Sequence, residues 1–241
     1  MPHPVADPAI LDELVLANRI LAREGVLDGF GHVSIRHPEE PGHYLVSRSL
    51  SPENVTAADI QRLTQAGERV AGDARASYAE VPIHGAVYRA RPDVMAVVHD
   101  HSPSIIPFGV SGVALRPIYH MGSVVGDTVP VWDIADEFGT TDMLVRTNAQ
   151  GDSLARRLGP RRVALMRGHG GVVATSGLHE TVFTAIYLER NAELALATRA
   201  LGPARELSDG EVAAAMATLL QPLSQERAWT YWRSRAEAAR R

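Results

Sequence analysis

Hydrophobic positions recur at helical spacing near the start of the chain. Ile10, Leu14 and Leu21 fall on one face of the segment 8–24, and Gly25 is a typical stop signal. This pattern predicts an amphipathic helix. Similar patterns, with capping residues or glycines at their ends, predict helices over 57–65, 80–90, 151–158, 176–201, 208–220 and 224–240.

Short β-branched segments alternate with these helices. Residues 32–36 and 43–47 flank the turn-rich segment 38–42, which predicts a hairpin. Further strands are predicted over 93–101, 114–120, 128–132, 161–166 and 168–175. The whole chain, 1–241, is therefore expected to be a single α/β domain with a central, mostly antiparallel sheet flanked by helices.

Composition and charge exclude several classes of function. The net charge of −4 gives no electrostatic footprint for nucleic acid, and the basic tail 233–241 is typical of a solvated helix end. No apolar run approaches the roughly 18 residues of a membrane helix, and the first residues do not resemble a secretion signal. We expect a cytoplasmic protein that binds neither nucleic acid nor membrane.

Two residue types are absent, and their absence limits the chemistry. The chain has no cysteine, which excludes thiol nucleophiles and thiolate metal sites. It has no lysine either, because all 24 basic residues are arginine, and this excludes a Schiff base with a carbonyl substrate or pyridoxal phosphate. We expect no pyridoxal phosphate and no nucleotide cofactor. A metal ion is the remaining electron sink for a carbanion.

Two histidines end the strand predicted over 93–101. Side chains alternate across a strand, so His99 and His101 share a face while Asp100 points away. Two such imidazoles can bind a divalent ion, although a strand that ends at the surface gives the same pattern. A third ligand is needed, and His169 is the best candidate because it lies in a glycine turn directly after a strand.

A carboxylate at the start of the predicted helix 80–90 suggests a second component of the metal site. Glu80 and His84 lie four residues apart on one helix face and could supply a carboxylate and an imidazole. A glutamate at a helix start also commonly complements the helix dipole.

Taken together, these residues resemble the class II aldolase/adducin family. That family carries a glutamate at a helix start, His-x-His about 20 residues later and a final histidine in a glycine turn. Here 19 residues separate Glu80 from His99, and 68 separate His101 from His169. The resemblance implies that the three histidines hold one divalent ion (Zn, Mn, Fe or Co), with Glu80 as general acid/base.

Departures from the family pattern indicate the subgroup. Where the sugar-phosphate enzymes use Asn and hydroxyl groups to bind phosphate, this chain has GHVS at 31–34 and SRS at 47–49. Imidazole and guanidinium thus replace neutral groups, which disfavours a phosphosugar. Arg48 suggests bidentate pairing with a substrate carboxylate, although a surface arginine is an equal alternative.

Several segments are most similar to the decarboxylase-like branch of this family. The resemblance implies a metal-dependent decarboxylase of a hydroxylated aromatic or heteroaromatic dicarboxylate. An aldolase acting on a non-phosphorylated hydroxy-keto acid or sugar is the main alternative, and an iron-dependent oxygenase or an adducin-like scaffold without catalysis are others. The residues expected to hold the small-molecule carboxylate are His32, Ser34, Ser47, Arg48 and Ser49.

The resemblance also implies a homotetramer with active sites at subunit interfaces. His120 lies near the position of a family tyrosine that donates a proton across a subunit boundary, and is expected to be catalytic. The C-terminal helices, 208–240, are expected to reach a neighbouring subunit and to place Tyr231 at its substrate site. Alternatively, the aromatics here, Trp232 in particular, pack on the core of their own chain.

Overall fold

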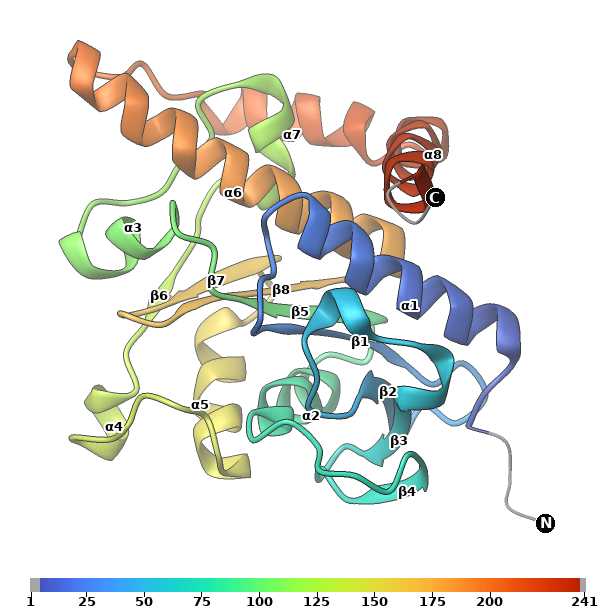
Figure 1. Cartoon of the computed structure of the whole chain (residues 1–241). Coiled ribbons are helices and arrows are strands. Elements are labelled where there is room, and N and C mark those ends of the chain that lie inside the picture. Colours follow the sequence, from blue (N-terminus) through green and yellow to red (C-terminus); the bar gives the residue numbers. More distant parts are fainter. Residues whose placement is uncertain (1–4, 239–241) are drawn as a thin grey trace.

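An eight-stranded sheet forms the centre of the molecule, with helices on both faces (Figure 1). The structure is a computed structural model that describes residues 5–238. The strand order is β4-β3-β2-β1-β5-β8-β7-β6, and only the β6–β7 pair is parallel within the described residues. The strands are β1 (His32–Arg36), β2 (His43–Ser47), β3 (Ile60–Thr64), β4 (Arg69–Gly72), β5 (Ala96–Asp100), β6 (Val131–Trp132), β7 (Val163–Met166) and β8 (Gly170–Thr175).

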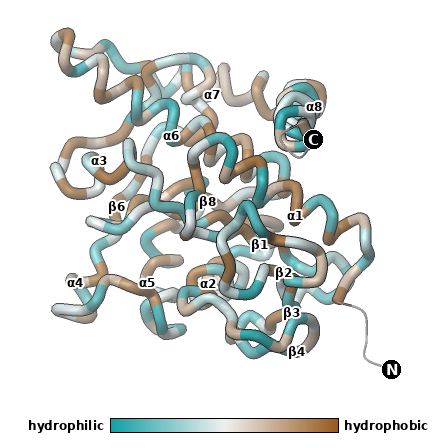
Figure 2. Tube along the Cα trace, in the orientation of Figure 1, coloured by the Kyte–Doolittle hydropathy of each residue, from teal (hydrophilic) through white to brown (hydrophobic). Residues whose placement is uncertain are grey.

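The helices divide into two layers around this sheet. In Figure 1 the long α6 and α1 run across one face, with α7 and α8 outside them, while α2 and α5 cover the other face. Hydrophobic and hydrophilic residues alternate along α1 and α6, as expected for helices with one face on a sheet (Figure 2). The α-helices are α1 (Pro8–Arg23), α2 (Val81–Ala90), α3 (Ile106–Ser111), α4 (Ala135–Phe138), α5 (Asn148–Leu158), α6 (Leu178–Leu201), α7 (Asp209–Leu219) and α8 (Pro222–Ala238), and the 3₁₀ helices are η1 (Pro52–Asn54), η2 (Ala57–Asp59) and η3 (His120–Val125).

The predicted fold class is confirmed. The hairpin of β1 and β2 forms in the expected place, with Ser34 opposite Val46. The predicted end of the last helix, at residue 240, lies outside the described residues. Among residues 5–238, none of the helices is both long and apolar enough to span a bilayer.

The helix predicted over 57–65 is wrong. Thr56 forms a capping box with Asp59, but only the short η2 follows it. Ile60–Thr64 then becomes β3, which is paired with β2 on one side and β4 on the other. Pairing with two neighbouring strands outweighs the local helical pattern.

The strand predicted over 114–120 is also wrong, because a buried side chain takes the backbone hydrogen bonds that a strand would use. The Oδ1 atom of Asn191 accepts the N–H of Ile118 at 3.0 Å, and its Nδ2 donates to the carbonyl of Arg116 at 2.9 Å. Residues 112–118 form a loop on α6. The strand predicted over 128–132 is confirmed only at its end, as β6.

Candidate metal centre

Three strands bring the predicted ligands together. β5 lies between β1 and β8, so His99 stands opposite His32 on one side and Val172 on the other. His169 lies in the tight turn between β7 and β8. A Cβ atom on Gly170 would lie 2.0 Å from the carbonyl oxygen of Asp100. Only a glycine there lets the His169 turn approach the end of β5.

The donor atoms of four side chains converge at this point. The Nε2 atom of His101 lies 3.1 Å from Nε2 of His99 and 3.1 Å from Nε2 of His169. The Oε2 atom of Glu80 lies 3.5 Å from the His99 nitrogen and 3.6 Å from the His169 nitrogen. All four donor atoms lie within 4.8 Å of one another. The structure thus groups the four residues predicted as ligands and acid/base.

Main-chain groups hold two of these side chains in place. The Nδ1–H of His99 donates to the carbonyl of Gly171 at 3.0 Å, which leaves a lone pair on Nε2. The Oε1 atom of Glu80 accepts the N–H of Val145 at 2.9 Å, so Oε2 faces the histidines. Both supports fix the direction of a donor atom toward the shared centre.

This arrangement fits a divalent ion. Nitrogen ligands at about 2.0–2.1 Å from a tetrahedral ion stand about 3.3 Å apart, close to the separations seen here. Nε2 atoms whose lone pairs point at one another do not attract each other. A cation bound between them accepts all of these lone pairs. The buried Nδ1 atom of His169 has no hydrogen-bond partner among the described residues, so the polar contacts of this ring are those of its Nε2 atom with His101 and Glu80.

The charge states of the site also suit metal binding. Burial, together with the neighbouring His99 and His169, lowers the pKa of His101 to about 4, so this imidazole is neutral at pH 7. Burial alone would raise the pKa of Glu80, but contact with His169 and His99 holds that pKa well below its ordinary value. A neutral imidazole beside a carboxylate is the form that binds a cation. Burial alone would lower the pKa of His99, but contact with Glu80 raises it, so a cation and a proton compete for this imidazole.

A cavity of about 360 Å³ adjoins two of the four residues. Glu80 and His101 form one wall, and Phe30, Tyr78 and Leu144 contribute apolar and aromatic surface. The wall also contains His32 and Ser49, two of the predicted substrate-binding residues. The volume is of the size that holds a small organic molecule.

Two predicted substrate-binding serines lie behind this wall. Ser34 is fully buried, and its Oγ atom contacts His84 and Tyr88. Ser47 is also fully buried, with its Oγ atom 2.9 Å from the hydroxyl of Tyr78. The expectation that they touch substrate is corrected, because both hydroxyls already bond to residues of the chain in the layer beneath the cavity.

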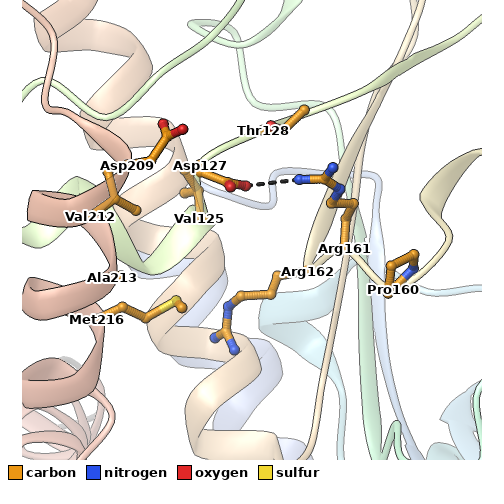
Figure 3. Close-up of a pocket in the computed structure, with 11 residues that line it drawn as sticks. Val125, Asp127, Thr128, Pro160, Arg161, Arg162, Asp209, Val212, Ala213 and Met216 are labelled. Carbon is orange, nitrogen blue, oxygen red and sulfur yellow. Dashed lines mark hydrogen bonds and ion pairs between the residues drawn. The ribbon is translucent and has the colours of Figure 1, made fainter.

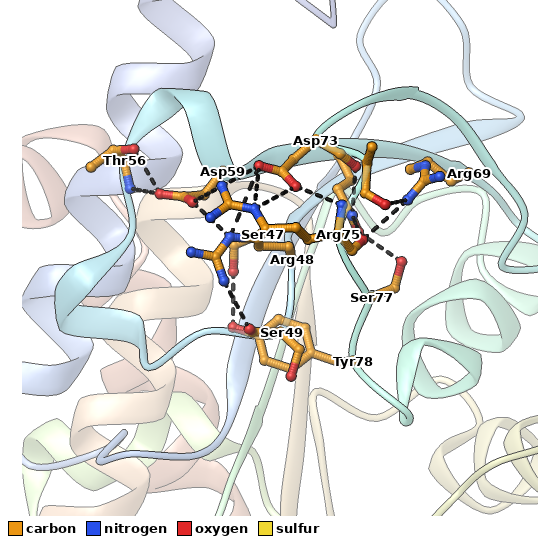
Figure 4. A network of polar contacts seen from close by, with 12 residues as sticks. Ser47, Arg48, Ser49, Thr56, Asp59, Arg69, Asp73, Arg75, Ser77 and Tyr78 are labelled. Atoms are coloured by element: carbon orange, nitrogen blue, oxygen red, sulfur yellow. Dashed lines mark hydrogen bonds and ion pairs between the residues drawn. The ribbon is translucent and has the colours of Figure 1, made fainter.

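Arg48 also departs from the expectation of a carboxylate clamp. Its Nε donates to Asp59 at 2.8 Å, and Asp73 lies 3.9 Å away (Figure 4). Arg75 joins the same two carboxylates, so the chain itself supplies the anions for this guanidinium. Successive side chains of an extended segment point to opposite sides, so Ser49 faces the cavity and Arg48 does not.

His120 and Tyr231 lie in another part of the subunit. His120 is exposed at the start of η3, and Tyr231 is 53% exposed on α8. Met121, which follows His120, lines a cavity of about 290 Å³ together with Tyr231. Trp232 is buried in its own chain and packs edge-on against Phe183, with 5.8 Å between the ring centroids.

A further cavity of about 330 Å³ lies between η3 and α7 (Figure 3). Its charged groups are paired within the chain, because Arg161 bonds to Asp127 at 2.8 Å and Arg162 bonds to Glu180. Apolar residues of α7 such as Val212 form the rest of its wall. The histidine cluster is therefore the better candidate for the reaction site.

The sequence reasoning missed two contributors to the site. Tyr78 lines the cavity, and its only sequence signal is its place two residues before Glu80. Val145 contributes a backbone N–H, which any residue except proline carries, so no sequence pattern could have identified it. His84 was considered as a partner of Glu80 at the metal, but its ring instead contacts His32 and Ser34.

Comparison with known proteins places this geometry in a family. Residues 12–196 match the family described as Class II Aldolase and Adducin N-terminal domain. The chain is 33% identical to the decarboxylase tropJ of Talaromyces stipitatus over 79% of this chain and 77% of that protein. It is 30% identical to a 3,4-dihydroxyphthalate decarboxylase of Arthrobacter keyseri over 98% of this chain and 97% of the relative.

A solved structure agrees with the fold. The L-fuculose 1-phosphate aldolase of Glaciozyma antarctica superposes with a TM-score of 0.77 at 24% identity, covering 96% of this chain and 90% of that one. The decarboxylase relatives and the aldolase fold support a carbon–carbon lyase. The chain belongs to the class II aldolase and adducin family.

Proposed function

We propose that this protein is a divalent-metal-dependent decarboxylase of a hydroxylated aromatic or heteroaromatic carboxylate. The observation that carries this proposal is the convergence of three imidazole nitrogens and one carboxylate beside a cavity that Glu80 and His101 line. The similarity to a 3,4-dihydroxyphthalate decarboxylase along nearly the whole chain supports this substrate class.

His99, His101 and His169 would hold the ion. When bound, a divalent ion supplies a Lewis acid that polarises substrate oxygens and offsets negative charge developing at carbon. Glu80, a carboxylate in this site, accepts the proton of the substrate hydroxyl group. The bond between the ring carbon and the carboxyl group breaks, CO2 leaves, and Glu80 returns the proton to that ring carbon.

The cavity wall would hold the rest of the substrate. His32 and Ser49 are polar groups of the cavity wall that would bond to a second carboxylate. Arg48 does not take part, because it bonds to Asp59. Phe30, Tyr78 and Leu144 would pack against the aromatic ring. The aromatic and apolar side chains of this wall provide a surface on which a flat ring can pack.

We further propose that the active enzyme is a homotetramer in which His120 and Tyr231 serve a neighbouring site. His120 precedes Met121, which lines one cavity together with Tyr231, and this supports a common location of His120 and Tyr231 in the subunit. Mixing inactive Glu80→Gln subunits with inactive His120→Ala subunits tests this. Sites completed in trans would restore part of the activity in mixed tetramers, whereas a monomer in solution would refute the proposal.

A substrate screen tests the reaction. Metal-depleted protein is loaded in turn with Zn²⁺, Mn²⁺, Fe²⁺ or Co²⁺ and given hydroxylated aromatic dicarboxylates, including 3,4-dihydroxyphthalate. We expect release of CO2 with the loaded protein and none from Glu80→Gln protein that contains the same amount of metal. Formation of an aldehyde or pyruvate without CO2 would replace this proposal by aldol cleavage, and oxygen consumption would replace it by oxygenation.

A further inference from the structure

A chain of four polar side chains runs from the cavity wall into the core. The Nδ1 atom of His32 lies 2.6 Å from Nε2 of His84, and Nδ1 of His84 lies 2.6 Å from Oγ of Ser34. The Oγ atom of Ser34 lies 2.8 Å from the hydroxyl of Tyr88. His84 and Ser34 are fully buried and Tyr88 is nearly so, while His32 lines the cavity.

The number of protons in this chain determines its direction. Each of the three contacts needs one hydrogen, and two directions are possible. If His32 donates to His84, then His84 donates to Ser34 and Ser34 donates to Tyr88. The phenol proton of Tyr88 is then left without an acceptor, because Ser34 is its only hydrogen-bond partner in the described part of the chain. If Tyr88 instead donates to Ser34, the hydroxyl proton of Ser34 has no acceptor, because its two partners among the described residues both donate to it. An unsatisfied buried donor is unfavourable.

The opposite direction satisfies every group. Tyr88 donates to Ser34, Ser34 donates to Nδ1 of His84, and Nε2–H of His84 donates to Nδ1 of His32. The single proton of a neutral His32 must then lie on Nε2. That atom has no hydrogen-bond partner within residues 5–238, so its N–H is available to a ligand.

The two imidazoles remain neutral at physiological pH. Burial, and secondarily the neighbouring His99, lowers the pKa of His84 to about 3. Burial and His84 likewise hold the pKa of His32 well below its ordinary value. A neutral donor adds no positive charge beside the proposed cation.

We propose that Tyr88, Ser34 and His84 are positioning residues that fix His32 as a permanent hydrogen-bond donor to a carboxylate or other oxyanion of the substrate. The identity of that ligand rests on the proposed function, whereas the direction of these hydrogen bonds does not. These hydrogen-bonded side chains do not deliver protons to the substrate. Loss of a proton from them would leave a buried phenolate at Tyr88, and burial raises the pKa of this phenol. Protonation of carbon therefore remains with Glu80.

The tautomer of His32 tests the proposal without any turnover. In the full-length, zinc-loaded protein, two-bond ¹H–¹⁵N correlation spectra distinguish Nδ1–H from Nε2–H imidazoles. The His32 signals are assigned by their loss in a His32→Gln variant. We expect His32 and His84 both to carry the proton on Nε2. A proton on Nδ1 of His32 in the wild-type protein would overturn the proposal, whichever reaction the enzyme catalyses.

Two variants at one position test the effect on binding. His84→Gln keeps an N–H donor near the place of Nε2, whereas His84→Leu removes it. With phthalate as an unreactive dicarboxylate probe, we expect Kd to rise about tenfold in His84→Leu and less than about threefold in His84→Gln, as for loss of one hydrogen bond. Zinc content should stay unchanged in both. Equal phthalate affinity in His84→Leu and the wild type would contradict the donor role, even if CO2 release is observed.

Discussion

Gly170 offers a sharp test of how the fold holds the metal centre. A Cβ atom at this position would lie 2.0 Å from the carbonyl oxygen of Asp100, whereas real contacts of this kind stay above 3.0 Å. In a Gly170→Ala variant the turn that carries His169 and the end of β5 must therefore move apart by about 1 Å. Metal sites tolerate deviations of only about 0.2 Å in ligand distance.

We expect Gly170→Ala to weaken zinc affinity by about 10- to 100-fold, in the range seen when residues that orient ligands are changed. Overpacking should also lower the free energy of unfolding of the metal-free protein by about 1–3 kcal/mol. Competition with a chelating dye measures the affinity, and urea unfolding measures the stability. Gly177→Ala is the matched control, because its Cβ would meet no atom within 4 Å. If Gly170→Ala protein bound zinc like the wild type, the reasoning would be refuted.

Four further predictions follow from the site and its surroundings. Glu80→Gln should keep stoichiometric metal by elemental analysis but lose about 10²- to 10⁴-fold in kcat, and full turnover would remove Glu80 from the mechanism. Zinc at 100 times its Kd should stabilise the wild type by about 2.7 kcal/mol in thermal unfolding, and a similar shift in His169→Ala would contradict its role as a ligand. Arg48→Ala should leave KM for substrate unchanged, because Asp59 and Asp73 already hold this guanidinium, and a raised KM would restore the clamp. Burial alone would raise the pKa of Asp59, but hydrogen bonds from Thr56 and Arg48 lower it, so its stabilising effect should be present above about pH 4 and lost on acidification. Urea unfolding at pH 3 and pH 6 should therefore show a smaller pH dependence in Asp59→Asn than in the wild type.

The sequence predicted those parts of the fold whose signals are local. The hairpin of β1 and β2 and the helix α1 depend on side-chain periodicity and turn residues, which a single segment contains. β3 was mistaken for a helix because its pairing with β2 and β4 is not visible in the segment itself. The strand predicted over 114–120 is wrong because the hydrogen-bond partner of this segment, Asn191, lies more than 70 residues away.

The same distinction applies to the site. Glu80 and the three histidines were predicted because their types and spacing together resemble a known family pattern, and the structure brings the four together. Arg48 was assigned to substrate because its charge is visible in the sequence, whereas its partners Asp59 and Asp73 are 11 and 25 positions away. Ser34 illustrates the opposite error, since a hydroxyl near a site can support an imidazole in the layer beneath the cavity.

The main-chain supports of His99 and Glu80 bear on how this enzyme can evolve. A carbonyl at Gly171 and an N–H at Val145 persist through almost any substitution. His99 and Glu80 therefore keep their orientation while neighbouring side chains are substituted. Under the proposed function, substrate specificity can then change at Phe30, Ser49 and Leu144 of the cavity wall without any substitution at the four clustered residues. These three positions are where a combinatorial library should seek altered substrate range.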